Sequence, residues 1–107
     1  MSHSGPVLTL EAFDVQSTAQ TDTELIAAQT GGKKIAVYQL YVTADAAVVV
    51  TFEGAGSAIW KQFVGAGGGS VVPYTGIAWF ETAAGEALTY TTDGAVNVAI
   101  AVKAAAV

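Results

Sequence analysis

Hydrophobic and polar residues alternate in short runs along the chain, and such runs return roughly every ten residues. The runs are rich in β-branched and aromatic side chains, and Gly, Asp, Asn or Pro separate one run from the next. A period of two is typical of strands, and helical spacing is not sustained anywhere in the sequence. The chain is therefore predicted to be all-β: a single-domain antiparallel β-sandwich, jelly-roll-like, with about eight strands.

The strongest strand pattern covers residues 35–43 and is apolar on both faces. One face would carry Ala36, Tyr38, Leu40 and Val42, and the other Ile35, Val37 and Tyr41. A strand of this kind is expected in the centre of a sheet that is covered on both sides. We expect its outer face to meet a neighbour.

The other predicted strands are residues 7–13, 25–29, 47–53, 58–64, 71–80, 87–92 and 96–102. In the first of them Glu11 and Phe13 fall on the face turned to water, and residues 14–23 after it are predicted to be a loop. The mixed pattern of residues 58–64 indicates an edge strand, in which Lys61 discourages pairing with another sheet. Pro73 and Gly76 make residues 71–80 one kinked strand or two very short ones.

Glycine and aspartate mark the predicted turns. Gly31-Gly32 and Asp93-Gly94 are typical of hairpins, whose tight turns need positive φ angles. Residues 44–46 are predicted to close a further hairpin, residues 54–57 to form the next turn, and residues 65–70 to be a flexible loop.

Length and composition favour one domain that touches another protein. The 107 residues suffice for a single core, with residues 1–6 as a flexible N-terminal arm. Hydrophobic residues make up 52% of the chain and charged ones only 12%, against roughly 25% charged in an ordinary soluble domain. Part of the apolar excess must therefore lie outside, where an oligomer or a large partner would cover it. The alternative is a monomer whose many alanines and glycines inflate the hydrophobic fraction.

Several partners are made improbable by the residue inventory. The net charge is −5 and the four cations are lysines, so the chain has no basic face for nucleic acid. The long uncharged run, residues 62–80, is interrupted by glycines and a proline, so no membrane segment is predicted. The N-terminus lacks the pattern of a secretory signal, so we expect a protein that is made and used without export.

No constellation of catalytic or metal-binding residues is found in the sequence. His3 is the only histidine and cysteine is absent, which removes the usual nucleophile–base pairs and thiolate metal sites. Glu81 and Glu86 flank a turn and are the one conceivable acid–base pair, although solvated loop carboxylates are the favoured interpretation. The aspartates, including Asp45, are isolated and form no calcium loop. We therefore expect no enzyme, no cofactor and no metal.

Large aromatic side chains are the main candidates for an interaction surface. Such rings either fill a core or anchor an interface. Core placement is favoured for Trp60, whereas both placements stay open for Tyr74, which follows Pro73 on a predicted loop. The candidate interface residues are Tyr41, Lys61, Tyr74 and Trp79.

The run from Val71 to Leu88, together with the preceding segment from Ala44 to Glu53, resembles small β-sandwich virion proteins of tailed bacteriophages. The resemblance covers roughly Lys34 to Val102 and centres on the turn from Phe80 to Leu88, which mostly encodes a fold. It implies a capsid decoration, or cement, protein: a homotrimer made in the host cytoplasm and bound to the major capsid protein on the outer capsid surface of the virion.

Two other functions stay open beside this one. A receptor- or glycan-binding module of a tail or fibre would use Tyr74, Trp79 and the glycine-rich loop. A small hydrolase would use Glu81 and Glu86.

Overall fold

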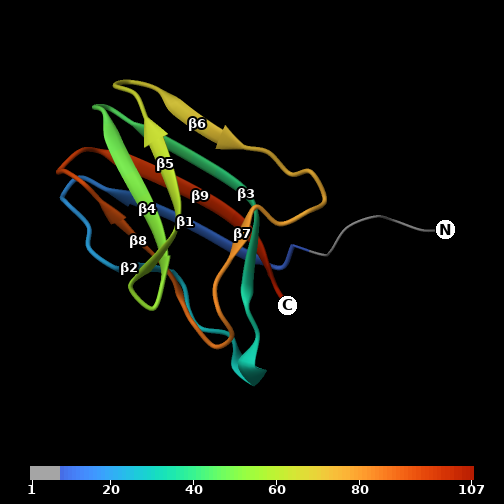
Figure 1. The fold of residues 1–107 in the computed structure, drawn as a ribbon. Coiled ribbons are helices and arrows are strands. Elements are labelled where there is room, and N and C mark those ends of the chain that lie inside the picture. The colour runs from blue at the N-terminus through green and yellow to red at the C-terminus, as the bar shows by residue number, and fades with distance from the viewer. Residues whose placement is uncertain (1–7) are drawn as a thin grey trace.

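The computed structural model describes residues 8–107, which form two antiparallel sheets packed face to face (Figure 1). The strands are β1 (Leu10–Gln16), β2 (Thr23–Ile26), β3 (Ile35–Ala44), β4 (Val48–Gly54), β5 (Ser57–Val64), β6 (Gly69–Val72), β7 (Phe80–Glu81), β8 (Leu88–Thr92) and β9 (Val98–Ala106). A short 3-10 helix, Thr30–Gly32, lies between β2 and β3. The predicted N-terminal arm and His3 lie outside the described residues.

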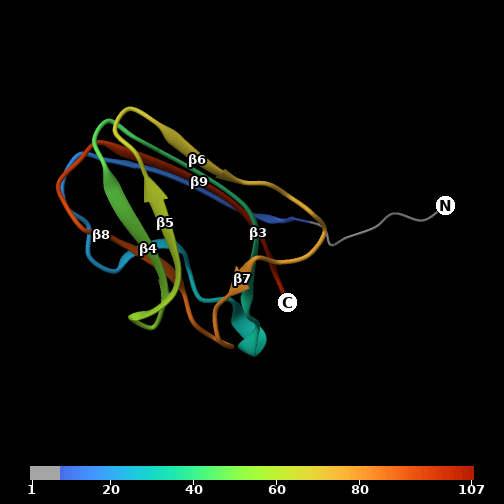
Figure 2. The ribbon, with the colours of Figure 1, turned by 45° about the horizontal axis from the view of Figure 1, so that its top comes forward.

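The strand order is that of a jelly roll. One sheet, called sheet A here, has the order β1-β9-β3-β6, and β7 continues the line of β6 by pairing with the first residues of β3. The other, sheet B, has the order β2-β8-β4-β5. Because β6 and β7 share one position, nine strands fill the eight positions of two interleaved Greek keys. The predicted all-β sandwich is confirmed, whereas the strand predicted at residues 71–80 is wrong in its middle, because residues 73–79 form a loop between β6 and β7 (Figure 2).

The core lies between the two sheets and is built from alternate residues of each strand. Phe52, Tyr90, Leu40 and Ile100 are fully buried there. Two further ring contacts extend the core to one edge. The centroid of the Phe80 ring lies 5.8 Å from that of Phe52 and 5.1 Å from that of Trp60. Trp60 thus packs against the core, as predicted from the sequence.

A β-bulge at Tyr38 changes which residues of β3 face the core. Val37 pairs with Ala104 and Gln39 with Lys103, so Tyr38 is an extra residue in the ladder. The predicted two faces are therefore wrong in part. Ile35 and Val37 share the core side with Leu40 and Val42, whereas Ala36 and Tyr38 join Tyr41 on the outer side. One inserted residue reverses the alternation for everything beyond it.

Three predicted hairpins are wrong, because the turns connect different sheets. Gly31 and Gly32 do have positive φ angles, but they lead from β2 in sheet B to β3 in sheet A. Residues 44–46 lead from sheet A to sheet B, and the segment after Asp93 leads back to sheet A. The turn at residues 54–57 is a true hairpin, in which Ala55 and Gly56 have φ angles of 50° and 80°.

The aspartates of the two crossing segments tie these segments to the strands beside them. Asp93 accepts a hydrogen bond from the Val49 amide at 3.0 Å, and Asp45 accepts one from the Asn97 amide at 3.0 Å. Residues 14–16, predicted to be part of a loop, continue β1 instead. There the Asp14 carboxylate accepts a hydrogen bond from the buried Tyr90 hydroxyl at 2.7 Å, a partner 76 residues away that the sequence pattern does not reveal.

Candidate functional site

The outer face of sheet A carries a row of apolar side chains that runs across β1, β9, β3 and β6. Phe13 on β1 is paired with Ala101 on β9, Ala101 with Tyr41 on β3, and Tyr41 with Val71 on β6. The neighbouring row is, in the same strand order, Val15, Ala99, Thr43 and Gly69. We call these two rows the apolar face.

The large side chains of the apolar face are exposed. The exposed fractions are 72% for Phe13, 59% for Val15, 46% for Tyr41 and 57% for Val71. Such a contiguous apolar area on a small domain is typical of an interaction surface. The small size of the alanines and the glycine in these rows leaves depressions beside the large residues.

A shallow hollow lies at the end of the apolar face near the 65–70 loop. Its volume is about 550 Å³, and its lining includes Val15, Tyr41, Gly69 and Ala99 together with Asp45 and Asn97. Gly68 in the wall accepts a hydrogen bond from the Ala44 amide at 3.1 Å, which fixes the glycine-rich loop to the end of β3. The hollow therefore combines an apolar floor with a polar rim.

The outer face of sheet B is different, because threonine hydroxyls and a carboxylate form a hydrogen-bonded cluster on β4 and β8. Thr51 on β4 lies opposite Thr91 on β8, and the Thr89 and Thr91 hydroxyls donate hydrogen bonds to the Glu53 carboxylate at 3.2 and 2.9 Å. Burial raises the pKa of Glu53, and the nearby Asp22 carboxylate raises it further, while the two hydroxyls oppose the shift. The outer face of sheet B is thus polar over β4 and β8, whereas Phe63 on the edge strand β5 is 71% exposed.

The loop between β6 and β7 covers the other end of sheet A's outer face. The Tyr74 ring lies 6.0 Å from the Tyr38 ring, and Ala78 packs on a small cluster of Ala36, Tyr38 and Ala105. The Trp79 indole donates a hydrogen bond to the Pro73 carbonyl at 2.8 Å, which closes the loop on itself. Tyr74 and Trp79 are each 40% exposed, so they anchor this loop and still reach the surface.

The four predicted interface residues do not form one surface. Tyr41 lies in the apolar face, and Tyr74 and Trp79 lie on the β6–β7 loop. Lys61 is exposed on β5, the edge strand of sheet B, opposite Thr51. The edge position confirms the prediction for residues 58–64.

Sequence reasoning missed Phe13, Val15 and Val71 as surface residues of interest. Phe13 was predicted to face water, and a phenylalanine at such a position was the available signal. Val15 had been assigned to a loop, and the strand bearing Val71 could not be aligned with β3 from the sequence. The row became visible only with the register of the four strands.

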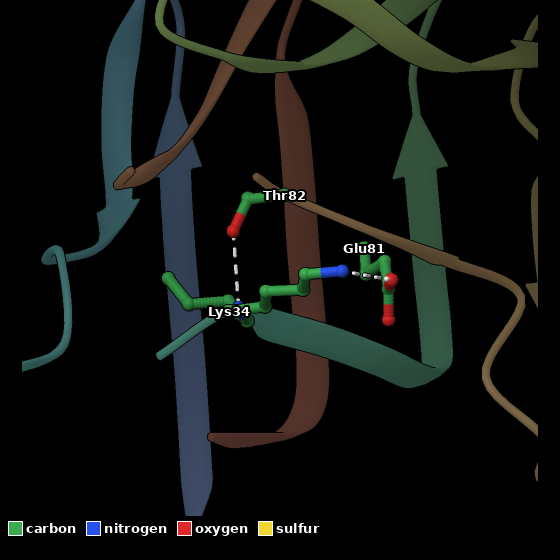
Figure 3. A network of polar contacts seen from close by, with 4 residues as sticks. Lys34, Glu81 and Thr82 are labelled. Carbon is green, nitrogen blue, oxygen red and sulfur yellow. Dashed lines mark hydrogen bonds and ion pairs between the residues drawn. The ribbon is translucent and has the colours of Figure 1, made fainter. Parts of the chain in front are cut away.

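The carboxylates considered for catalysis serve as surface contacts. The Lys34 ammonium donates to Glu81 at 3.2 Å, with both side chains 46% exposed (Figure 3). Beside this pair the Thr82 hydroxyl accepts a hydrogen bond from the buried Ile35 amide at 3.0 Å (Figure 3). Glu86 lies against Gly54, where an added Cβ would come within 2.7 Å of its carboxylate. The arrangement fastens β7 and the following turn to β3 and β4.

Within residues 8–107 no cluster of three or more His, Cys, Asp or Glu side chains could hold a metal ion. That part of the chain also has no helix of the length and hydropathy needed to cross a membrane. Comparison with protein-family models, with curated proteins and with solved structures finds no match to this chain.

Proposed function

We propose that the chain is a non-enzymatic virion structural protein: a capsid decoration protein that binds the outer capsid surface and stabilises the head. The observation that carries the proposal is the exposed apolar face on a sandwich that has few charges. Jelly rolls are frequent in viral capsid and lectin domains, which supports the proposal by analogy of fold alone. The homotrimer and the major capsid protein as partner are part of the proposal and come from the resemblance.

The proposed mechanism is mechanical. A subunit that binds only the closed shell lowers the free energy of that shell relative to its opened form, and the effect grows with each bound copy. Several linked contacts raise the effective concentration of each next contact, so each single contact can be weak. A rigid sandwich with a flat apolar surface is suited to this role, because little conformational entropy is lost when it binds.

The test is to locate the chain in assembled particles. Immunogold labelling and cryo-electron microscopy of phage particles from cells that produce the chain are expected to place it over the head. Addition of the purified chain to heads that lack it is expected to raise the temperature at which they release DNA. Particles that carry no label, or heads that melt unchanged with the chain bound, would contradict the proposal.

A second candidate is a receptor- or glycan-binding module of a tail or fibre. The hollow beside Tyr41 favours it, because an exposed ring next to Asp45, Asn97 and glycine backbone groups offers both stacking and hydrogen bonds. Label at the tail tip, with saccharide binding that is lost in Tyr41→Ala, is the result expected of this function.

A further inference from the structure

The outer face of sheet A is closed at one end and open at the other. Around Ala36, Tyr38 and Ala105 the β6–β7 loop covers the sheet, and these three side chains are at most 9% exposed. At the other end Phe13 and Tyr41 stand open to water. One continuous sheet surface is thus buried by the chain itself over part of its length only, and the remainder needs a cover from outside.

Two copies of the apolar face can pack on each other so that several large side chains of one copy lie opposite small side chains of the other. A two-fold axis between β9 and β3, roughly parallel to the strands, places β9 of one copy over β3 of the other, and β1 over β6. Near the axis Tyr41 then faces Ala101 of the other copy, and Thr43 faces Ala99. We propose that two copies of this chain pair through their apolar faces in this way.

The same operation fills the hollow. It brings Val15 of one copy over Gly69 of the other, so that a side chain 59% exposed in the single chain enters the low part of the partner face. Sheets stacked in this manner lie about 10 Å apart, with their strands within about 30° of each other. Tyr41 and Val15 of one copy therefore meet small residues on the other, whereas Phe13 faces Val71, so that two large side chains pack on each other there.

Charge distribution favours a second copy as the occupant. The chain as a whole carries −5, so two copies repel through most of their surfaces. The apolar rows are bordered by one acid and one base on the same side of the sheet, because Glu11 is paired with Lys103 across β1 and β9. Both are exposed. Counting these two side chains and Asp45, which lines the hollow, this face carries a net charge of −1 out of the −5, so it is where two copies approach at low cost.

The area sets the expected strength. With strands about 4.8 Å apart and a rise of about 3.3 Å per residue, the two rows across four strands give a footprint of about 250 Å². Pairing of two copies then covers on the order of 500 Å² of accessible surface, which is below the size of a stable specific interface and is typical of a weak contact. The pair should therefore be reversible and depend on concentration.

The inference goes beyond the proposed function, because a three-fold contact joins two different patches whereas this contact joins a patch to itself. If both contacts exist and their axes cross at a right angle, two trimers join into a hexamer. If only this one exists, the largest species is a dimer. In either case loss of the apolar face halves the mass.

Sedimentation velocity from micromolar to millimolar concentration tests the pairing with two matched variants. Phe13 and Phe63 are the same residue type and are 72% and 71% exposed, but Phe13 lies in the apolar face and Phe63 lies on β5 of sheet B. Phe13→Ser is expected to halve the mass, and Phe63→Ser to leave it as in the parent chain. Because both side chains are exposed, both variants should fold, which circular dichroism checks.

Cross-linking tests the orientation of the pair. The chain has no cysteine, so Tyr41→Cys and Ala101→Cys each introduce a single thiol. A short bis-maleimide is expected to link the two variants in a mixture several-fold faster than it links either variant alone. A strictly monomeric parent chain, equal effects of Phe13→Ser and Phe63→Ser on the mass, or no preference for the mixture would each overturn the inference. None of these results depends on where the chain lies in a phage particle.

Discussion

Replacing Thr82 by valine is expected to loosen the attachment of β7 to β3. Thr82 is 1% exposed, its hydroxyl accepts a hydrogen bond from the Ile35 amide at 3.0 Å, and its own amide donates to the Ile35 carbonyl at 3.0 Å. Valine keeps the shape and the second bond but leaves the Ile35 amide buried without a partner. A buried donor left unpaired costs about 1–3 kcal/mol.

The expected loss for Thr82→Val is therefore about 2 kcal/mol, which for a domain of this size lowers the melting temperature by roughly 8–16 °C. The matched control is Thr82→Ser, which keeps the acceptor and removes one methyl group, at a cost of about 0.8 kcal/mol. Urea unfolding followed by tryptophan fluorescence measures both. A valine variant as stable as the serine variant would refute the assigned role of the hydroxyl, as would unchanged hydrogen exchange of the Ile35 amide.

Three further changes test other parts of the fold by urea unfolding. Tyr90→Phe is expected to cost about 1.5–3 kcal/mol, since it removes a buried hydrogen bond to the Asp14 carboxylate; an unchanged midpoint would contradict this. Glu53 has a raised pKa in the fold, so its proton stabilises the fold at low pH, and this contribution is lost as the pH rises through the folded pKa. Glu53→Gln should therefore gain stability relative to the parent chain as the pH rises above the ordinary range of a carboxyl group, whereas parallel pH curves would count against it. Gly56→Ala, at a φ of 80°, should cost about 1 kcal/mol, and Gly65→Ala, where the backbone is not in the left-handed region, should be nearly neutral.

The strands could be predicted from the sequence because alternation is a local signal. Val48, Val50 and Phe52 face the core as their spacing indicates, and the edge position of residues 58–64 follows from the mixed pattern around Lys61. The bulge at Tyr38 could not be predicted, since nothing in the residues of β3 marks where a ladder gains one residue. It is fixed by the pairing with β9, more than sixty positions further along the sequence.

The hairpins failed for a reason that belongs to the jelly roll. Asp93-Gly94 shows that the chain reverses, but not whether the next strand pairs with the last one or crosses to the opposite sheet. Both outcomes need a short polar turn, and the choice is set by which strands are already neighbours in each sheet. Here β9 pairs with β1 and β3, and Asp93 instead bonds to Val49 on β4. A dipeptide carries no information about such distant partners.

Uncharged outward residues make the outer faces of the two sheets differ in polarity. The outward residues of β8 are Thr89 and Thr91, and their hydroxyls donate hydrogen bonds to the Glu53 carboxylate. The outward residues at matching positions of β9 are Ala99 and Ala101, which offer water nothing and leave the rings beside them uncovered. Threonine and alanine are equally uncharged, yet threonine makes the outer side of β8 polar and alanine leaves the outer side of β9 apolar. The proposed pairing therefore lies on the side of the alanines, because no side chain between the exposed rings there can form a hydrogen bond with water.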